Sequence, residues 1–236
     1  MSDSLLLDIH PSTNPKPFTS EIIETQDDRI RLAKTMFYAT GGGQPADRGE
    51  IKTENYSVQV EDVLGKNKIY HVVGQHDFSL GMKVIGSIDQ QRRNSHAKMH
   101  TAQHLFSALA NDVWSATTVG NQIGTERTRI DFKFEDKSIF DSLELENLVN
   151  NTIQKKLDVT MNMVDRELLK NDNLLRVNLD RMPAEETQLR VIEIAGVDKC
   201  PCAGTHVQNT SELDTVEITK VKSKGKGKLR VEYRFH

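Results

Sequence analysis

His100-Thr101-Ala102-Gln103-His104 is the stretch that decides the fold, because it places two imidazoles one helical turn apart. Around it, the pattern from Ser95 to Trp114 predicts a helix with Ser95 as its N-cap. The apolar stripe of this helix consists of Met99, Ala102, Phe106, Leu109 and Val113. At about 100° per residue, a second stripe lies roughly 130° away and consists of His96, His100 and His104. The helix therefore has one face for a core and another for chemistry.

The second informative stretch is Cys202-Ala203-Gly204-Thr205-His206, which follows an expected strand near the C-terminal end. Gly204 permits the tight turn that aims two side chains at one point. Together the two stretches supply imidazoles and a thiolate. This donor set suits Zn²⁺ at roughly 2.0–2.3 Å per bond and disfavours Mg²⁺ and Ca²⁺, which prefer oxygen. The sequence therefore predicts a zinc site.

The spacing alone leaves the ligand set open. His96/His100 has the same spacing as His100/His104, and Cys200 could replace Cys202. The alternative without a metal is a buried free cysteine beside histidines that are satisfied by other contacts. Peptidase chemistry is disfavoured, because zinc peptidases place a glutamate directly after the first histidine and this chain has a threonine there.

Composition describes an ordinary globular protein of one or two domains. The chain has 236 residues, and its formal net charge of −3 does not suggest a general nucleic-acid binder. No run approaches the ~20 apolar residues of a membrane span, and residues 1–10 lack the basic and apolar regions of a secretion signal. Cys200 and Cys202 are too close together for an ordinary structural disulfide, so we expect a reducing, cytoplasmic location.

The N-terminal part, residues 1–88, is predicted to be a β-rich domain resembling a small barrel or twisted sheet. Apolar alternation, separated by Gly and Asn clusters, appears at 57–63, 69–73 and 84–88. The triple glycine Gly41-Gly42-Gly43, followed by Gln44, is too dense for a strand. Because glycine has no Cβ, this segment permits close approach of the backbone to a ligand. The alternative is a flexible loop.

Residues 89–236 are predicted to form a second domain of mixed helices and strands. Beyond the first helix we expect a strand at 127–134 with Ile130, Phe132 and Phe134 inward, a helix around 145–157, strands at 160–164 and 189–195, and a hairpin at 216–235 whose turn holds Gly225 and Gly227. The predicted fold class is α+β. It combines a small β-barrel-like N-terminal domain with an α/β sandwich that has helices on an antiparallel sheet.

An alternating basic run lies in the expected hairpin and contains no acidic residue. It consists of Lys220, Lys222, Lys224, Lys226, Lys228 and Arg230. On one face of a hairpin such charges can bind RNA phosphates, and the candidates are Lys222, Lys224, Lys226 and Lys228. A solvated hairpin that protects a sheet edge is the alternative.

The chain resembles the editing domain of alanyl-tRNA synthetase, and more closely its free-standing relatives, the AlaX proteins. The resemblance rests on His100-Thr-Ala-Gln-His104-Leu, Cys202-Ala-Gly-Thr-His206-Val and Thr40-Gly-Gly-Gly-Gln-Pro, and it covers nearly the whole chain. We expect the medium-sized AlaX class, because the glycine motif is present without an aminoacylation domain before it or an oligomerisation domain after it. The editing domain of threonyl-tRNA synthetase is related but lacks the triple glycine, which disfavours threonine editing.

The resemblance implies a trans-editing hydrolase with one zinc ion, which cleaves serine and in some cases glycine from mischarged tRNA(Ala). By the resemblance, the zinc ligands fall on His100, His104, Cys202 and His206, and the pocket residues on Thr35 and Gln44. The glycines Gly41, Gly42 and Gly43 are expected to contact the substrate. Two departures stand beside the ligand Cys202: Ala203 replaces a usual glycine, and Cys200-Pro201 precedes it.

Editing requires a pocket that demands a hydroxyl group, since a pocket sized for alanine excludes serine poorly. Thr35 and Gln44 combine donor and acceptor capacity and are the expected recognition groups. Replacement of Gln44 is therefore expected to impair deacylation without releasing metal. A non-catalytic, zinc-stabilised tRNA-binding module is the alternative function. No DNA or membrane partner is expected, and the sequence leaves the oligomeric state open.

Overall fold

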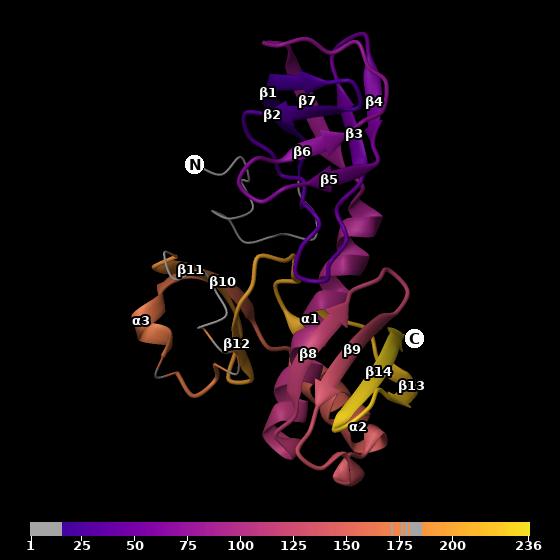
Figure 1. The fold of residues 1–236 in the computed structure, drawn as a ribbon, viewed down its shortest axis with the longest axis vertical. Helices are drawn as coiled ribbons and strands as arrows, with labels where there is room; N and C mark the ends of the chain where they lie inside the picture. Colours follow the sequence, from indigo (N-terminus) through magenta and orange to yellow (C-terminus); the bar gives the residue numbers. More distant parts are fainter. Residues whose placement is uncertain (1–15, 171, 176, 178, 180–185) are drawn as a thin grey trace.

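The computed structural model describes residues 16–170, 172–175, 177, 179 and 186–236. In Figure 1 the N-terminal strands form one end of the molecule, and the long helix α1 runs from them into the other end. A smaller sheet stands to one side of this helix. The arrangement brings two segments that are distant in sequence, the loop that contains Gln44 and the loop that contains Cys202, into contact with His100 of α1.

The N-terminal sheet contains seven antiparallel strands. They are β1 (Phe18–Gln26), β2 (Arg29–Leu32), β3 (Gly49–Lys52), β4 (Ser57–Val60), β5 (Asp62–Leu64), β6 (Tyr70–Val72) and β7 (Lys83–Ile88). Their order is β4-β3-β7-β1-β2-β6-β5, and the sheet is nearly closed (Figure 1). Its interior is filled by apolar side chains such as Ile22, Ile30, Ile51 and Val84. The predicted β-rich, barrel-like N-terminal part is confirmed.

Helix α1 (Gln90–Trp114) begins earlier than the sequence predicted. Its N-cap is Asp89, whose carboxylate accepts a hydrogen bond from the backbone N–H of Arg92 at 3.0 Å. The expectation that Ser95 caps the helix was wrong. Asp and Ser favour N-caps equally, and the apolar stripe starts after the first turns of the helix, which are polar.

The apolar stripe of α1 packs as predicted except at its end. Met99, Ala102 and Phe106 are buried in the main core, whereas Val113 is exposed and the neighbouring Trp114 is buried. The aromatic ring of Trp114 packs edge-on against Phe140. Because burial of this large ring is more favourable than burial of a valine, Trp114 and not Val113 faces inward in the last turn.

The main C-terminal sheet has four antiparallel strands in the order β13-β14-β9-β8. Its elements are β8 (Thr117–Gln122), β9 (Thr128–Lys133), β13 (Val216–Ser223) and β14 (Lys228–Phe235). Helix α2 (Ser142–Ile153) packs with α1 on this sheet, and short 3-10 helices cover Lys137–Ile139 and Thr210–Glu212. Ile130, Phe132 and Phe134 are buried, and Gly225 and Gly227 lie in the turn of the hairpin, as predicted.

A three-stranded sheet contains β10 (Val159–Asp165), β11 (Gln188–Ile194) and β12 (Asp198–Pro201), with the short helix α3 (Arg166–Leu169) beside it. The two faces of β11 differ. Leu189 and Val191 face a small core of their own, whereas Ile192 and Ile194 join the main core around α1. Because side chains alternate along a strand, Arg190 shares the face of Ile192.

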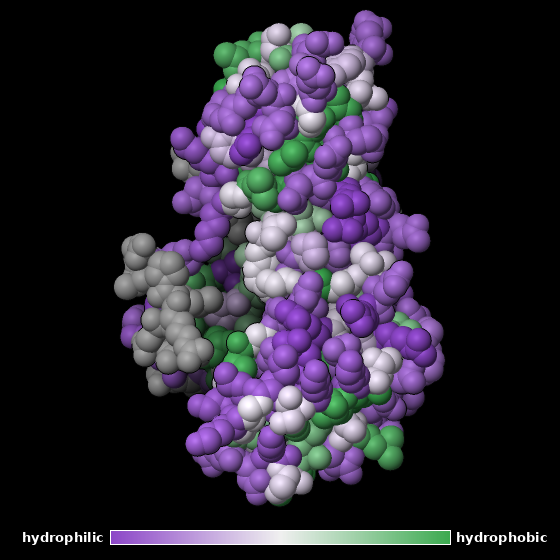
Figure 2. Space-filling model, turned by 45° about the vertical axis from the view of Figure 1, so that its right-hand side comes forward, coloured by the Kyte–Doolittle hydropathy of each residue, from purple (hydrophilic) through white to green (hydrophobic). Residues whose placement is uncertain are grey.

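These elements confirm the α+β class with helices on an antiparallel sheet. The predicted boundary between residues 88 and 89 falls just before α1, and the division into two domains stays a prediction. Among the described residues, no helix combines the length and the apolar character that a bilayer crossing requires. The face shown in Figure 2 is mostly hydrophilic, with apolar residues in scattered areas.

Candidate metal centre

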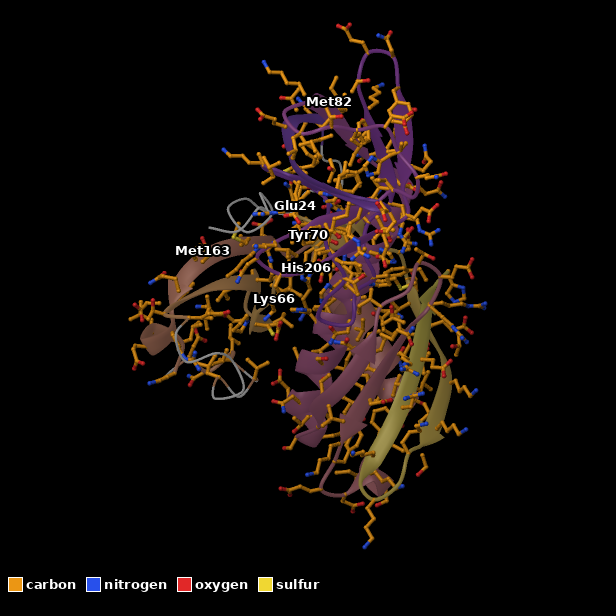
Figure 3. The ribbon with its side chains drawn as sticks, turned by 45° about the horizontal axis from the view of Figure 1, so that its top comes forward. Glu24, Lys66, Tyr70, Met82, Met163 and His206 are labelled. Carbon is orange, nitrogen blue, oxygen red and sulfur yellow. The ribbon has the colours of Figure 1, made fainter. Side chains whose placement is uncertain are left out.

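Four side chains from two segments, α1 and the loop after β12, meet in one cluster. His100 and His104 lie on α1, Cys202 follows β12 directly, and His206 lies in the loop after it. One ligand atom from each of the four lies within 4.8 Å of the others. Figure 3 shows His206 near the N-terminal sheet, whereas the turn of hairpin β13–β14 lies at the other end of the molecule. The structure thus brings together all four sequence-predicted metal ligands.

The distances in this cluster match a tetrahedral metal site. The Sγ atom of Cys202 lies 3.6 Å from Nε2 of His100 and 3.4 Å from Nε2 of His206. A tetrahedral zinc with ordinary Zn–S and Zn–N bonds separates such a sulfur and nitrogen by about 3.6 Å. The cluster is therefore already spaced for a zinc-sized ion.

Gln44 fixes the ring of His100. The backbone N–H of Thr205 donates to Oε1 of Gln44 at 3.1 Å, and the Gln44 amide nitrogen donates to the Thr205 hydroxyl at 2.9 Å. Since a backbone N–H can only donate, the amide orientation is determined. Nδ1 of His100, at 2.8 Å from Oε1, must then carry a proton and donate it. In the neutral ring the lone pair of Nε2 then faces Cys202.

The other two histidines are held in the same way. Nδ1 of His104 lies 2.9 Å from the Asp198 carboxylate, which can only accept a hydrogen bond when ionised. Nδ1 of His206 lies 3.2 Å from the Thr101 hydroxyl, whose own proton goes to the Ala97 carbonyl at 2.9 Å. In the neutral form, all three rings therefore carry the proton on Nδ1, and Nε2 is the atom that can bind a metal. Such outer partners are typical of histidine ligands.

The two cysteines differ in protonation. Burial would raise the pKa of Cys202, but the neighbouring His100 and His206 hold it well below its usual range. Burial raises the pKa of Cys200 well above its usual range, and Asp198 adds to this effect. Because the thiolate is the metal ligand, Cys202 is the better donor of the two.

His104 responds strongly to its surroundings. Burial opposes its charge, but the hydrogen bonds to Asp198 and Cys202 outweigh this effect and raise its pKa to about 10. A metal must displace the Nε2 proton of His104, since ligands bind in their deprotonated form.

Cys200 and His96, the alternative ligands of the sequence analysis, lie outside the four-residue cluster. Cys200 belongs to a second group with His104 and Asp198, which could also hold an ion. His96 is buried, its Nδ1 has no hydrogen-bond partner in the described part of the chain, and burial lowers its pKa to about 4. It belongs to neither cluster found among the described residues. The geometry favours His100/His104 with Cys202.

Gly204 is required for this packing. A Cβ at this position would lie 2.2 Å from Cε1 of His100, which is far inside van der Waals contact. Ala203, the departure from the family pattern, is exposed. The close approach therefore depends on the second of the two small residues, and an alanine in place of the first is accommodated at the surface.

Arg190 holds the loop that carries Cys202. Its buried guanidinium donates through Nη1 to the carbonyl oxygens of Cys202 and Gly204. The side chain of Tyr38, from the loop between β2 and β3, is buried, and its hydroxyl donates to the Gly41 carbonyl at 2.7 Å. The pKa of Tyr38 is raised by burial and by the negative charge of the Cys202 thiolate, so it remains a neutral phenol.

The triple glycine forms a tight turn. Backbone hydrogen bonds join Gly41 and Gln44 in both directions, and the φ angles of 56° at Gly42 and 85° at Gly43 belong to the left-handed region, as in a type I′ turn. A Cβ on Gly43 would collide with the side chain of Asn121. The turn thus packs against β8 and directs Gln44 towards the cluster. Contact of the three glycines with a substrate stays a prediction.

Thr35 lies apart from this arrangement. Its hydroxyl accepts from the backbone N–H of Phe37 at 3.1 Å and lies 2.8 Å from Nε2 of His71, inside the N-terminal sheet. Within the described part of the chain it forms no hydrogen bond with the four cluster residues. The structure therefore brings Gln44, but not Thr35, into contact with the cluster.

A cavity of about 400 Å³ lies beside the glycine turn. Gly43, Gln44, Arg48, Arg92 and Glu61 are among the residues that line it. It is large enough for an amino acid and part of a nucleoside.

The basic run occupies the surface that the sequence predicted. Lys222, Lys224, Lys226 and Lys228 are all exposed at the hairpin end. Arg230 differs, because its guanidinium forms two hydrogen bonds with Asp131 at 2.7 and 2.8 Å. RNA binding by the four lysines stays a prediction.

Sequence reasoning missed several outer partners of the cluster. Thr101 lies inside the histidine motif, but nothing in the motif indicated that its hydroxyl contacts His206. Asp198 and Arg190 lie on neighbouring strands close to Cys202 in sequence, but their contacts depend on how β11 and β12 pair. No local pattern could have revealed them.

The fold and the site define a class: α+β proteins in which a helix and a C-terminal loop join three histidines and one cysteine. Two family models match parts of the chain. The model described as "Threonyl and Alanyl tRNA synthetase second additional domain" matches residues 189–232, and "tRNA synthetases class II (A)" matches residues 8–92.

Relatives match almost the full chain. Alanyl-tRNA editing protein AlaX-M of Methanosarcina barkeri is 33% identical over 92% of this chain and 93% of its own. The protein of the same name in Saccharolobus solfataricus is 34% identical, with the same two shares. Alanine--tRNA ligase of Methanosphaera stadtmanae is 29% identical over 96% of this chain but 26% of its own. The chain belongs to the AlaX family of alanyl-tRNA editing proteins, as the motifs predicted.

Proposed function

We propose that His100, His104, Cys202 and His206 hold one zinc ion. The fit rests on the donor set, on Sγ–Nε2 distances that suit tetrahedral bonds, and on three histidines whose Nδ1 atoms are held by outer partners, so that Nε2 faces the metal. Zinc bound there supplies a Lewis acid or a positioning charge for an ester carbonyl.

We propose further that the protein is a trans-editing hydrolase for mischarged Ser-tRNA(Ala), with Gly-tRNA(Ala) as a second candidate substrate. The reaction adds water across the aminoacyl ester. The bond between the carbonyl carbon and the ribose oxygen breaks, and free serine and tRNA leave without use of ATP. Membership of the alanyl-tRNA editing family is the observation that carries this proposal.

In this proposal the protein's own residues bind and orient. Gln44 holds His100 and lines the cavity beside the glycine turn, so it links the cluster to the space where an aminoacyl group fits. The amide nitrogen of Gln44 carries two protons, and among the described residues it donates only to the Thr205 hydroxyl; its second N–H is the proposed donor to a serine hydroxyl. Thr35 is proposed as a recognition residue on the resemblance, and its contact with His71 limits it to an indirect role in the present conformation.

The contact between Gln44 and His100 changes one expectation. Loss of an outer partner typically costs about 10–100-fold in metal affinity or activity. Replacement of Gln44 is therefore expected to weaken metal binding as well as deacylation, where the sequence alone suggested that the metal is spared.

A non-catalytic tRNA-binding module is the second candidate function. Four protein ligands favour it, because structural zinc sites are closed whereas catalytic sites keep a position open. The exposed lysines Lys222, Lys224, Lys226 and Lys228 could bind tRNA phosphates in either function.

Deacylation of Ser-, Gly- and Ala-tRNA(Ala), measured side by side with and without a chelator, separates the candidates. The hydrolase proposal expects rapid, chelator-sensitive loss of serine and little loss of alanine. Binding of Ser-tRNA(Ala) with no turnover of any of the three would contradict the hydrolase and support the module.

A further inference from the structure

A buried ion pair fastens the glycine-motif loop, residues 33–48 between β2 and β3, to helix α1. Arg93 of the helix and Asp47 of the loop are both fully buried. Nε of Arg93 donates to Oδ1 of Asp47 at 3.0 Å, and Nη2 donates to Oδ2. This two-point contact fixes the direction as well as the distance between helix and loop.

The same pair joins the two arms of the loop. Oδ2 of Asp47 accepts from the backbone N–H of Tyr38 at 2.7 Å, and the backbone N–H of Asp47 donates to the Tyr38 carbonyl at 3.1 Å. Nη2 of Arg93 also donates to the carbonyl of Met36 at 2.9 Å, and Arg92 donates to the carbonyl of Ala46 at 3.0 Å. The loop is thereby closed at its base and bound to the helix.

This base lies between the two groups that must meet at the cluster. Gln44 stands three residues before Asp47, and His100 stands seven residues after Arg93, which is two helical turns. The loop and the helix are therefore joined at two points: by the ion pair and by the Gln44–His100 contact of 2.8 Å. A small rotation of the loop about the ion pair would displace Gln44 from His100.

Stability alone does not explain the pair. Replacement of a buried ion pair by apolar side chains is often neutral or stabilising, because desolvation offsets the attraction. Here Nη1 of Arg93 is buried and has no hydrogen-bond partner among the described residues, so these residues do not fully compensate its desolvation. What the pair supplies is a fixed orientation.

We infer that Arg93 and Asp47 are positioning residues for the metal centre: they hold the glycine-motif loop so that Gln44 stays hydrogen-bonded to His100. The inference rests on the proposed deacylase for its kinetic test, but not for its spectroscopic one. Neither residue touches the cluster itself.

A double-mutant cycle provides the kinetic test. Asp47→Asn keeps the size of the side chain and removes its charge, and we expect kcat for Ser-tRNA(Ala) to fall about 10–100-fold with a smaller change in KM. In a Gln44→Ala background the same change is expected to have almost no further effect, because its route to the cluster is gone. Equal losses in both backgrounds would overturn the inference.

Asp214→Asn is the matched control. Asp214 also forms an ion pair with α1, at 2.9 Å from Nζ of Lys98, but it has no part in the loop. In each background we expect Asp214→Asn to leave kcat at the value of that background: the wild-type value in the wild-type protein and the Gln44→Ala value in the Gln44→Ala protein. If Asp47→Asn does not fold, Arg93→Lys takes its place in the cycle with the same two outcomes, since lysine keeps the charge and loses the two-point contact.

The apo protein gives a reading that requires neither metal nor deacylation. ¹⁵N chemical shifts of the imidazoles report which ring nitrogen of His100 carries the proton. We expect the Nδ1–H form to dominate in wild type and Asp214→Asn, and a mixture of tautomers in Asp47→Asn and Gln44→Ala. An unchanged His100 tautomer in folded Asp47→Asn overturns the inference even if the protein proves to be no hydrolase.

Discussion

The metal cluster and the basic hairpin end, residues 222–228, differ in how their side chains are held. Each imidazole of the cluster is buried and has a defined partner for its Nδ1: Gln44, Thr101 or Asp198. The lysines of the hairpin end are exposed, and they lie at the far end of the molecule from His206 (Figure 3). In the cluster, where metal binding depends on bond geometry, each imidazole is held by a specific hydrogen bond. Attraction to phosphates needs charge at a surface and little else.

This difference predicts how the two regions respond to substitution. In the cluster the loss of a single ligand or outer partner should have a large effect, because each ring is held in place by a specific hydrogen bond. At the hairpin end the effects should be gradual, dependent on salt, and shared among several lysines.

The largest effect is expected for Cys202→Ala. The variant loses the thiolate, and with it the sulfur that lies against His100 and His206. Zinc affinity and the deacylation rate should both fall by more than about 100-fold, which is the largest effect typical of losing an outer partner. Elemental analysis and a deacylation assay measure this. A variant without zinc that still removes serine at the normal rate would contradict any role of the metal in the reaction.

Gly204→Ala should come next. The added methyl group collides with the His100 ring, so either the ring or the loop must move. Overpacking of this kind typically destabilises a protein by about 1–3 kcal/mol, and the shift of His100 should also weaken zinc binding. Thermal unfolding and zinc titration detect both. Ala203→Gly is the control, because Ala203 is exposed and its methyl group has no such contact. Equal effects of the two substitutions would refute the packing argument.

Asp198→Ala is expected to weaken zinc binding by about 10–100-fold while leaving the four ligands in place. The carboxylate holds Nδ1 of His104 at 2.9 Å and raises the pKa of that ring to about 10 after burial is offset. Without it, the pKa of His104 in the apo protein should fall, since the hydrogen bond that raises it most is gone. Fewer protons should accordingly be released when zinc binds near pH 8, which calorimetry in buffers of different ionisation enthalpy can count.

The smallest effects are expected at the hairpin end. Lys224→Glu with Lys226→Glu should weaken tRNA binding and reduce its salt dependence by roughly 0.7–0.9 log units per lost phosphate contact. Zinc content and thermal stability should stay unchanged, because both side chains are exposed. Unaltered tRNA affinity at low salt would remove the hairpin from the binding surface.

The sequence predicted best what depends on local pattern. The fold class, the strands β9, β10, β11, β13 and β14, the hairpin turn and the four members of the cluster followed from periodicity, spacing and motif resemblance, whereas β8 and β12 were not predicted. The N-cap of α1 was misplaced because Asp89 and Ser95 carry the same signal. The outer partners escaped because they depend on tertiary packing: Asp198 lies 94 residues from His104, and Gln44 lies 56 residues from His100.

X-ray absorption at the zinc edge of the purified protein, together with its metal content, tests the central claim most directly. We expect one zinc per chain, with one sulfur near 2.3 Å and three nitrogens near about 2.0–2.1 Å, and loss of the sulfur signal in Cys202→Ala. Absence of zinc, two sulfur ligands, or a shell of oxygen atoms would contradict the account.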